Sequence, residues 1–332
     1  MFRRPGARQF LDAARVIPDT ISAIVPTIGR ADALAALLEA LASQTRRPDE
    51  VIIADGSDGT EVRAVAANGQ WRRRGLPVRY LHVHPPNAVR QRQAAIEAAT
   101  GSLLLLLDDD VVPESNCVAA LADCLRSHMA VGVSADFSNQ QWPPPTTLWR
   151  WYLRWVHRIT GSMWQGRVIG PLLRFGYHPM PVDPSPMEWL GSGNSLVRRD
   201  AYDRAGGFSD FFLHRSTLNE DVDLGLKLGR QGRLLLCPAA RMAHTHAPGG
   251  RASVRVLAED DLYNRYVILR RTMRHSRFRA LTQITIYFVV ETLSGLAASA
   301  RHLRSTGFGD RLVGRVRALM RIAGAAPGIK TL

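Results

Sequence analysis

Cysteine and lysine are scarce in this 332-residue sequence, and two nucleotide-binding motifs are absent from it. The cysteines Cys117, Cys124 and Cys237 show no metal-ligand spacing, and any disulfide would leave one of them unpaired. The first 20 residues hold arginines but no apolar core of signal-peptide length. We therefore expect a reducing, cytoplasmic setting and no export. The absence of G-x-G-x-x-G after the first apolar strand counts against a dinucleotide enzyme, and G-x-x-x-x-G-K-[ST] is absent too.

The charge of the sequence is unevenly distributed. The net charge is +14, and from Arg241 onward 15 arginines and one lysine face five acidic residues, which gives +11. A hydrophobic content of 46% and a charged content of 22% are typical of a globular protein. The length allows one large α/β domain with an appendage, or two domains. The basic character therefore belongs mostly to the last quarter of the chain.

The first 100 residues have the pattern of a doubly wound α/β sheet. An apolar strand at 21–25 precedes a helix with leucines at helical spacing and a second buried strand at 51–54. Strand, helix and strand within about 35 residues predict a parallel βαβ unit. A third strand near 76–83 and a helix over 87–100 continue the alternation.

Three aspartates, Asp108, Asp109 and Asp110, follow five leucines that predict a strand covered on both faces. Ligands of such sheets bind beyond the carboxyl ends of the strands, where this triplet would join the turns at 26–30 and 55–58. Two carboxylates about 6 Å apart repel by roughly 3 kcal/mol at an effective dielectric of about 20, so a buried triplet favours a bound cation. Asp108 and Asp110 point the same way in an extended chain, and oxygen ligands suit Mg²⁺ or Mn²⁺. A solvated turn after a core strand is the alternative.

Seven segments, in family order, resemble the family 2 glycosyltransferases, an inverting group with the GT-A fold. They are SAIVPTIGR, EVIIADGSDGT, RQAAIEAATG, LLLLLDDDV, EWLGSGNSLVRRDAYDRAGGF, NEDVDLGLKLGRQG and ARMAHTH. They cover roughly Thr20 to His246, and the ordered set is far more specific than any one motif. The resemblance implies a mainly parallel sheet flanked by helices, a nucleotide-sugar donor and sugar transfer assisted by a divalent cation.

For the donor, the resemblance implies a set of residues that contact the nucleotide or its sugar. They are Pro26, Thr27, Arg30, Asp55, Ser57, Arg92, Asp108, Asp109, Gly193 and Asn194. Asp55 would read the base, and Asp108 or Asp109 would lie nearer the ribose. The sequence departs from the family where Ala54-Asp55 replaces two acids and where Arg92-Gln93 replaces an Arg-Asn pair. These changes concern the base and sugar contacts and not the fold.

For the cation, the resemblance implies a site built from Asp110 and Asp108, with Asp110 as the first candidate for a direct ligand. His244, after a predicted strand, matches a family position where a histidine completes the metal site. His246 is its rival, since it faces the same side of an extended segment. Mn²⁺ or Mg²⁺ is the expected ion.

For the chemistry, the resemblance implies that Asp221 is the catalytic base, with Glu220 beside it. Asp221 would take the proton of an acceptor hydroxyl that attacks the sugar from the face opposite the leaving nucleotide. The leaving diphosphate gains negative charge, so a cation is needed there and a separate carboxylate must handle the proton. Glu220 and Asp221 also fit the start of a helix capped by Asn219, and both interpretations can hold together.

Six of the seven tryptophans lie between residues 141 and 189. This Trp- and Pro-rich segment falls where relatives build the acceptor side, and we expect Trp164 and Trp189 to lie there. Aromatic rings stack on sugars, and they also anchor at lipid headgroups with arginine nearby. The alternative is a Pro-rich loop whose tryptophans pack on the domain.

The predicted organisation has three parts: an N-terminal extension (1–19), a GT-A domain (20–250) and a basic C-terminal helical region (251–332). The domain would comprise a nucleotide-binding half (20–115), the acceptor-side insertion (141–189) and an acceptor and catalytic half (190–250).

Residues 280–300 are nearly long enough to span a bilayer but carry Gln283 and Glu291. A helix that lies on the membrane or docks on the domain is therefore favoured over a spanning one. Its basic flanks suit anionic lipid. We expect a cytoplasmic protein attached peripherally to the inner face of the cell membrane.

The sequence therefore predicts a metal-dependent inverting glycosyltransferase that moves a sugar from a nucleotide-sugar, most often UDP-linked in this family, to a glycan or lipid-linked acceptor in envelope or polysaccharide synthesis. A nucleotidyltransferase would share the sheet and carboxylates, but its first loop would need more basic residues than Arg30. A basic membrane- or nucleic-acid-binding protein is the other alternative. The arginines cluster on a tail with an apolar helix and without a nucleic-acid-binding motif, so we expect no nucleic acid partner.

Overall fold

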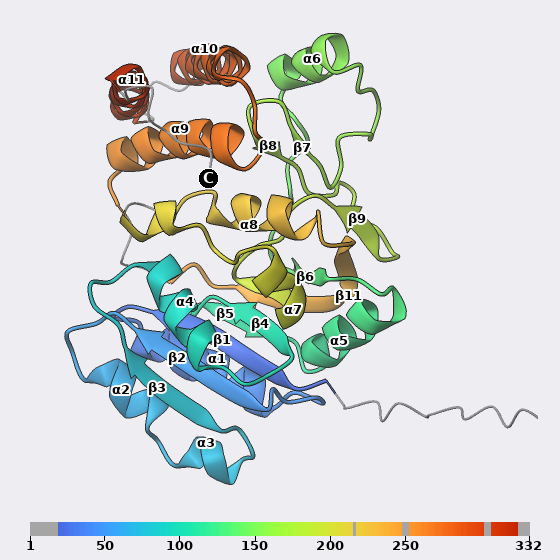
Figure 1. Cartoon of the computed structure of the whole chain (residues 1–332), viewed down its shortest axis with the longest axis vertical. Helices are drawn as coiled ribbons and strands as arrows, with labels where there is room; N and C mark the ends of the chain where they lie inside the picture. The colour runs from blue at the N-terminus through green and yellow to red at the C-terminus, as the bar shows by residue number, and fades with distance from the viewer. Residues whose placement is uncertain (1–18, 215–216, 248–251, 302–306, 325–332) are drawn as a thin grey trace, which may run out of the picture.

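The computed structural model describes residues 19–214, 217–247, 252–301 and 307–324 (Figure 1). The expected N-terminal extension lies almost wholly outside the described residues. Within them, a nine-stranded mixed sheet has the order β3-β2-β1-β4-β10-β6-β11-β5, with β9 beside β11, and β7 pairs with β8 separately. The strands are β1 Ile21–Thr27, β2 Glu50–Asp55, β3 Val78–His82, β4 Leu103–Leu107, β5 Val111–Pro113, β6 Gly132–Phe137, β7 Val168–Ile169, β8 Leu173–Arg174, β9 Ser185–Met187, β10 Asn194–Arg198 and β11 Leu234–His244.

Helices cover both faces of this sheet. They are α1 Ala31–Ala42, α2 Glu61–Ala66, α3 Gln70–Arg73, α4 Ala88–Ala98, α5 Cys117–Ser127, α6 Thr147–Val156, α7 Arg199–Arg204, the 3₁₀ helix η1 Asp210–His214, α8 Glu220–Leu228, α9 Val254–Arg271, α10 Arg277–Arg301 and α11 Phe308–Gly324. One core lies between the sheet and α1, α2, α3 and α5, and the other contains α4, α7, α8 and the C-terminal helices. The predicted doubly wound α/β fold with C-terminal helices is confirmed.

The parallel block β3-β2-β1-β4 follows from the sequence pattern. Every residue of β1 and of β4 is buried, as expected for strands covered on both faces. Along β1, Ile21, Ala23 and Val25 pack in one core and Ile24 in the other, with the two-residue period of a strand. Strand β10, which runs antiparallel between β4 and β6, was not predicted.

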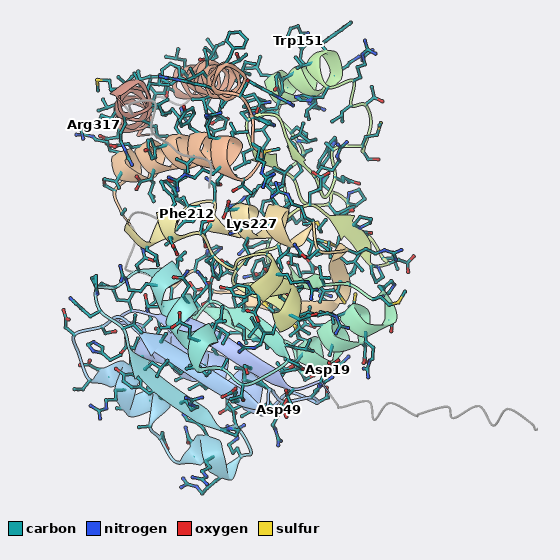
Figure 2. All side chains as sticks on the ribbon, viewed as in Figure 1. Asp19, Asp49, Trp151, Phe212, Lys227 and Arg317 are labelled. Atoms are coloured by element: carbon teal, nitrogen blue, oxygen red, sulfur yellow. The ribbon has the colours of Figure 1, made fainter. Side chains whose placement is uncertain are left out.

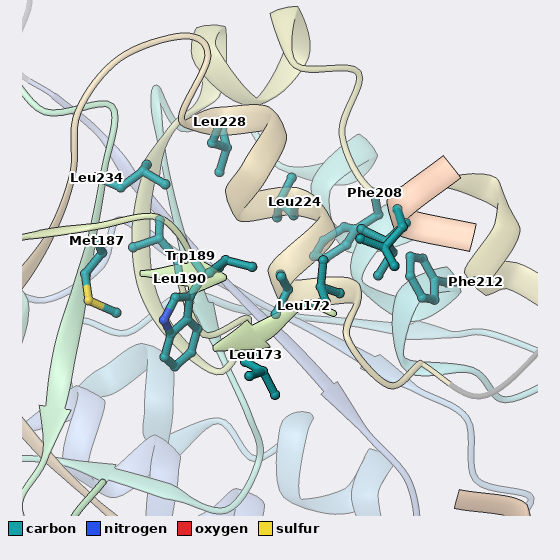
Figure 3. Close-up of a cluster of buried hydrophobic side chains, with 14 of the residues drawn as sticks. Leu172, Leu173, Met187, Trp189, Leu190, Phe208, Phe212, Leu224, Leu228 and Leu234 are labelled. Atoms are coloured by element: carbon teal, nitrogen blue, oxygen red, sulfur yellow. The ribbon is translucent and has the colours of Figure 1, made fainter. Parts of the chain in front are cut away.

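Helix α8 is fixed by its own hydrophobic cluster (Figure 3). Leu224 and Leu228 project from α8 toward Trp189, Leu190 and neighbouring apolar side chains, and all are buried. At Gly225 an added Cβ would lie 2.6 Å from the Cα of Trp189, so only glycine allows this close approach. This packing fixes the position of the first turn of α8, which carries Glu220 and Asp221, relative to the sheet.

The Trp-rich insertion is only partly a loop, because it contains α6, the β7–β8 hairpin and β9. Trp149, Trp164 and Trp189 are buried, whereas Trp151 and Trp155 are exposed. The packing interpretation therefore holds for the three buried rings, whereas contact of the tryptophans with an acceptor or a membrane stays a prediction.

Helices α9, α10 and α11 pack against one another. Residues 277–297 of α10 are long and apolar enough to cross a membrane by length and composition, and 22% of that apolar window is buried. Ala280, Ile284 and Tyr287 on one side of α10 are buried in the core. One side of this helix thus docks on the domain while the other is open.

Candidate functional site

A cleft of about 580 Å³ lies at the carboxyl ends of β1 and β4. It brings together most of the predicted site residues, namely Pro26, Thr27, Arg30, Arg92, Asp108, Asp109, Asp110, Trp189, Gly193, Asn194, Glu220, Asp221 and His244. Asp55, Ser57 and Trp164 are not among its lining residues. The three aspartates sit at this edge because β1 and β4 are parallel neighbours whose ends coincide.

Asp109 is held by the turn after β1. Thr27 Oγ1 donates to Asp109 Oδ2 at 2.7 Å, and Arg30 Nη1 donates to Oδ1 at 3.0 Å. Burial raises the pKa of Asp109 despite these two partners. Both oxygens of this carboxylate are thus engaged by the protein, and Asp109 positions the first turn.

Asp110 meets His244 across two paired strands. β5 begins right after Asp110 and pairs antiparallel with the end of β11, with His244 opposite Val111. His244 Nε2 therefore lies 3.0 Å from Asp110 Oδ1, although the two residues are 134 positions apart. Burial alone would raise the pKa of Asp110, but the hydrogen bond and charge of His244 and the charge of Arg30 outweigh it and lower this pKa.

Among the described residues, Asp108, Asp110 and His244 form a group whose ligand atoms all lie within 4.8 Å of one another. Two carboxylates and one imidazole suit Mn²⁺, and the carboxylates suit Mg²⁺. The residues therefore fit the predicted cation. His246 is not in this group; its ring lies 4.1 Å from that of His244, and its Nε2 lies 2.8 Å from Gln140 Nε2.

Arg92 lies between the two acidic clusters. This buried side chain on α4 places Nη2 2.5 Å from Asp108 Oδ1 and Nη1 3.6 Å from Glu220 Oε1. The sequence pointed to Arg92 as a donor contact but not to this bridge. One guanidinium thus neutralises part of both clusters.

The glycine of the GSGN turn allows Asp108 its position. Asp108 N donates to Gly193 O at 3.2 Å, and a Cβ at Gly193 would lie 2.2 Å from Asp108 Oδ2. The next residue, Asn194, is buried and donates from Nδ2 to Ala135 O at 2.7 Å. The antiparallel pairing of β10 with β4 sets this turn beside the aspartates.

Helix α8 presents Glu220 and Asp221 to the cleft from its first turn. Asn219 occupies the N-cap position in a left-handed conformation (φ 69°) but makes no side-chain cap; it donates to Asp261 Oδ1 at 2.9 Å. The predicted helix start at Glu220, with Asn219 at the N-cap position, is confirmed, although the asparagine side chain does not bond to the helix amides. Ser192 Oγ donates to Glu220 Oε1 at 2.9 Å. Burial and the neighbouring charge of Asp221 raise the pKa of Glu220 to about 7.

Asp55 and Ser57 bond to each other beside the cleft. Asp55 is fully buried and accepts from Ser57 N at 2.8 Å and from Tyr80 Oη at 2.9 Å. Burial and this hydrogen bond raise the pKa of Tyr80 to about 12. The base-reading role of Asp55 stays a prediction.

Trp164, predicted on the acceptor side, packs edge-on against Phe175 with ring centroids 5.5 Å apart.

Comparison with known proteins decides the family. The profile described as "Glycosyl transferase family 2" matches residues 22–204, more than half of the chain. The chain belongs to glycosyl transferase family 2. It is therefore a glycosyltransferase of EC class 2.4, and the predicted family is confirmed.

Two bacterial proteins are similar in sequence to this glycosyltransferase. The O-antigen biosynthesis protein RfbC of Myxococcus xanthus is 27% identical over 75% of the chain, but the chain spans only 19% of that protein. The N-acetylglucosaminyl-diphospho-decaprenol L-rhamnosyltransferase of Mycobacterium tuberculosis is 26% identical over 69% of the chain and 77% of its own length.

A solved structure agrees with the fold. The mannosyltransferase PcManGT from Pyrobaculum calidifontis, crystallised with GDP-Man and Mn²⁺, aligns with a TM-score of 0.56. The alignment covers 93% of this chain and 88% of that one at 14% identity. It supports a GT-A-like fold for the glycosyltransferase, C-terminal helices included.

Two charged residues of the glycosyltransferase cleft were missed from the sequence. Arg174, on β8, has Nη1 2.5 Å from Asp221 Oδ2, and its guanidinium lies 5.3 Å from the centre of the Trp189 ring. Asp136, at the end of β6, also lines the cleft, and burial raises its pKa. No motif marks either residue; a basic side chain on the acceptor-side insertion was the only available signal for Arg174.

Proposed function

We propose that this glycosyltransferase is a metal-dependent inverting enzyme that uses a nucleotide-sugar donor, with UDP as the first candidate nucleotide. The observation that carries the proposal is the pair of acidic clusters that face one cleft. Asp108, Asp110 and His244 form one cluster, and Glu220 and Asp221 form the other. Such a division separates stabilisation of the leaving group from removal of the proton.

Asp108, Asp110 and His244 would hold the cation, which when bound neutralises charge on the leaving diphosphate. The protein's own part on this side is to fix those ligands. Arg92 aligns Asp108, while the β5–β11 pairing aligns Asp110 with His244. Arg30, next to Asp109 and Asp110, adds positive charge where the diphosphate would lie.

Asp221 would accept the proton from the acceptor hydroxyl as its oxygen bonds to the anomeric carbon. The bond from that carbon to the diphosphate oxygen breaks on the opposite face, so the configuration inverts. Arg174 donates to one oxygen of Asp221 and orients the carboxylate. Glu220, with its raised pKa, adds less negative charge next to this base than a fully ionised carboxylate would.

The acceptor would be a glycan or a lipid-linked sugar in envelope or polysaccharide synthesis. O-antigen biosynthesis by the Myxococcus relative and rhamnosyl transfer by the Mycobacterium relative support this class. Trp142, Tyr177 and Trp189 of the insertion line the cleft and offer aromatic faces for a sugar. Residues 20–115 would then serve the donor and residues 190–250 the acceptor. A cytoplasmic location at the inner face of the membrane completes the proposal.

The test is a thermal-shift titration of the wild type and Asp110→Ala with UDP, dTDP and GDP, each with Mn²⁺, Mg²⁺ or EDTA. A ligand at a hundred times its Kd stabilises by about 2.7 kcal/mol, enough to raise Tm by several degrees. We expect a shift that needs the metal, selects one nucleotide and is lost in the variant. Asp221→Asn should keep the shift and lose transfer by roughly 10²- to 10⁴-fold. No shift with any nucleotide and metal would refute the proposal.

A further inference from the structure

The outward side of α10 is an uncharged stripe. Its exposed positions at spacings of three and four residues are Phe278, Thr282, Thr285, Val289, Leu293 and Leu296. The stripe extends over the 19 residues from Phe278 to Leu296, and the 18 steps between its ends rise about 27 Å along the helix. Phe278, at the start of the stripe, is 82% exposed. An open helix side in water ordinarily carries charges, so this stripe needs an apolar partner.

Helix α6 adds aromatic and basic side chains. Trp151 and Trp155, one turn apart, are 64% and 65% exposed. Figure 2 shows Trp151 pointing away from the body of the protein. Arg150 and Arg154 are exposed beside them, and the guanidinium of Arg154 lies 5.7 Å from the centre of the Trp155 ring. Tryptophan and arginine together are typical of the headgroup region of a bilayer.

The two helices are tied into one surface. Trp149, on the inner side of α6, donates from Nε1 to Glu291 Oε1 of α10 at 3.0 Å and stacks on Tyr287. Both helices lie at the same end of the molecule, with α11 next to α10 (Figure 1). The inward contacts fix the positions from which the outward side chains project.

The charge of this surface has one sign. The sequence of α6 contains no acidic residue, and that of α10 contains only Glu291. The carboxylate of Glu291 accepts a hydrogen bond from Trp149 and pairs with Arg315, whose Nη2 lies 3.2 Å from Glu291 Oε2. Arg150, Arg154, Arg277 and Arg279 are exposed. Each such arginine contributes about 1 kcal/mol at an anionic membrane.

We propose that the exposed sides of α6 and α10 form a docking surface for an anionic lipid bilayer. The uncharged stripe would lie in the headgroup and acyl boundary, with the tryptophans and arginines at headgroup level. The insertion that carries α6 also supplies Trp142, Arg174 and Trp189 to the cleft. Docking through α6 therefore presents the acceptor side of the cleft to lipid-linked substrates, a step that rests on the proposed function.

The test is flotation of the full chain with vesicles of phosphatidylcholine alone or mixed with phosphatidylglycerol. We expect binding to the mixed vesicles that weakens as salt rises from 0.15 to 0.5 M. The double variant Trp151→Glu with Trp155→Glu, and separately Leu293→Glu, should lower the partition coefficient by about tenfold or more. Met129→Glu, at an 80% exposed methionine between α5 and β6, is the matched control and should float like the wild type.

Failure of the wild type to float with anionic vesicles overturns the proposal. Flotation of both surface variants at the wild-type level also overturns it. The same holds if the wild type forms a dimer without lipid, or a complex with nucleic acid, and the surface variants abolish that assembly. The metal-dependent nucleotide shift provides the separate readout and should stay intact in both variants. A chain that floats but shows no nucleotide shift would refute the proposed function and leave the docking surface standing. A chain that shows the nucleotide shift but does not float would refute the docking surface and leave the proposed function standing.

Discussion

Replacing Glu220 by glutamine should change the stability of the protein in a pH-dependent way. Glu220 lies in the first turn of α8, where its side chain is 12% exposed and adjoins Asp221. Burial, first, and the charge of Asp221, second, raise its pKa from 4.5 to about 7. Arg92 and Ser192 oppose this rise without cancelling it. The folded protein therefore holds a proton that the unfolded chain releases.

The sign of the effect follows from proton linkage. Below about pH 4.5 the carboxyl is protonated in both states and does not affect stability. Between 4.5 and about 7 only the unfolded chain releases its proton, so the free energy of unfolding of the wild type falls. Above pH 7 the loss is complete, and the difference between 4.5 and about 7 corresponds to about 3 kcal/mol. Glutamine cannot ionise and avoids this loss.

Urea unfolding at pH 5, 6, 7 and 8, without metal or nucleotide, measures the difference. Glu220→Gln should match the wild type within about 1 kcal/mol at pH 5 and become more stable by up to about 3 kcal/mol at pH 8. Glu97→Gln, at an exposed glutamate of α4, is the control and should follow the wild type at every pH. An offset that is constant with pH, or a variant that is weaker at pH 8, would show that Arg92 holds Glu220 ionised in the folded protein.

Three further substitutions test other parts of the site. Gly193→Ala should displace the Asp108 carboxylate, which lies 2.2 Å from the new Cβ, and weaken metal-dependent nucleotide binding about tenfold. Gly309→Ala, with no atom within 4 Å of its Cβ, is the control and should bind like the wild type. Equal titrations of the two variants would contradict this prediction. Arg174→Met should lower kcat by roughly 10- to 100-fold, because the Asp221 carboxylate loses the side chain that orients it. The nucleotide thermal shift should stay unchanged, and Arg174→Lys should restore part of kcat. An unchanged kcat would count against the orienting role. Leu228→Ala, at a fully buried side chain of α8, should cost about 2–5 kcal/mol in urea unfolding, and a loss below about 1 kcal/mol would mean that the cluster in Figure 3 repacks.

The parts of the fold that local sequence determines were predictable. β1, β2 and β4 are apolar runs that end in polar turns, and parallel pairing carries those turns to one edge. Thr27, Arg30 and Asp109 meet there as expected. The metal group of Asp108, Asp110 and His244 was placed through the family resemblance, since no local pattern links His244 to the aspartates.

The parts that depend on distant pairing were not predictable from the sequence. β10 contains only two apolar residues, and none of its residues indicates its direction, yet its antiparallel course sets Gly193 against Asp108. Arg174 reaches Asp221 from β8, a two-residue strand that pairs with β7 inside the insertion. Trp164 and Trp189 look alike in the sequence, but only Trp189 lines the cleft. Such outcomes depend on packing between segments and not on composition.

The pairing of β5 with β11 also sets the order in which the proposed cation site is completed during synthesis. Asp110 leaves the ribosome 134 residues before His244, an interval of roughly 7 to 27 seconds at ordinary elongation rates. During that time the aspartates lack the imidazole and the Ala247 amide that contact Asp110 in the finished protein. A nascent chain can therefore form the β3-β2-β1-β4 block without yet having the complete set of ligands. If the proposed site binds a cation, full affinity for it would report that β11 has joined the sheet.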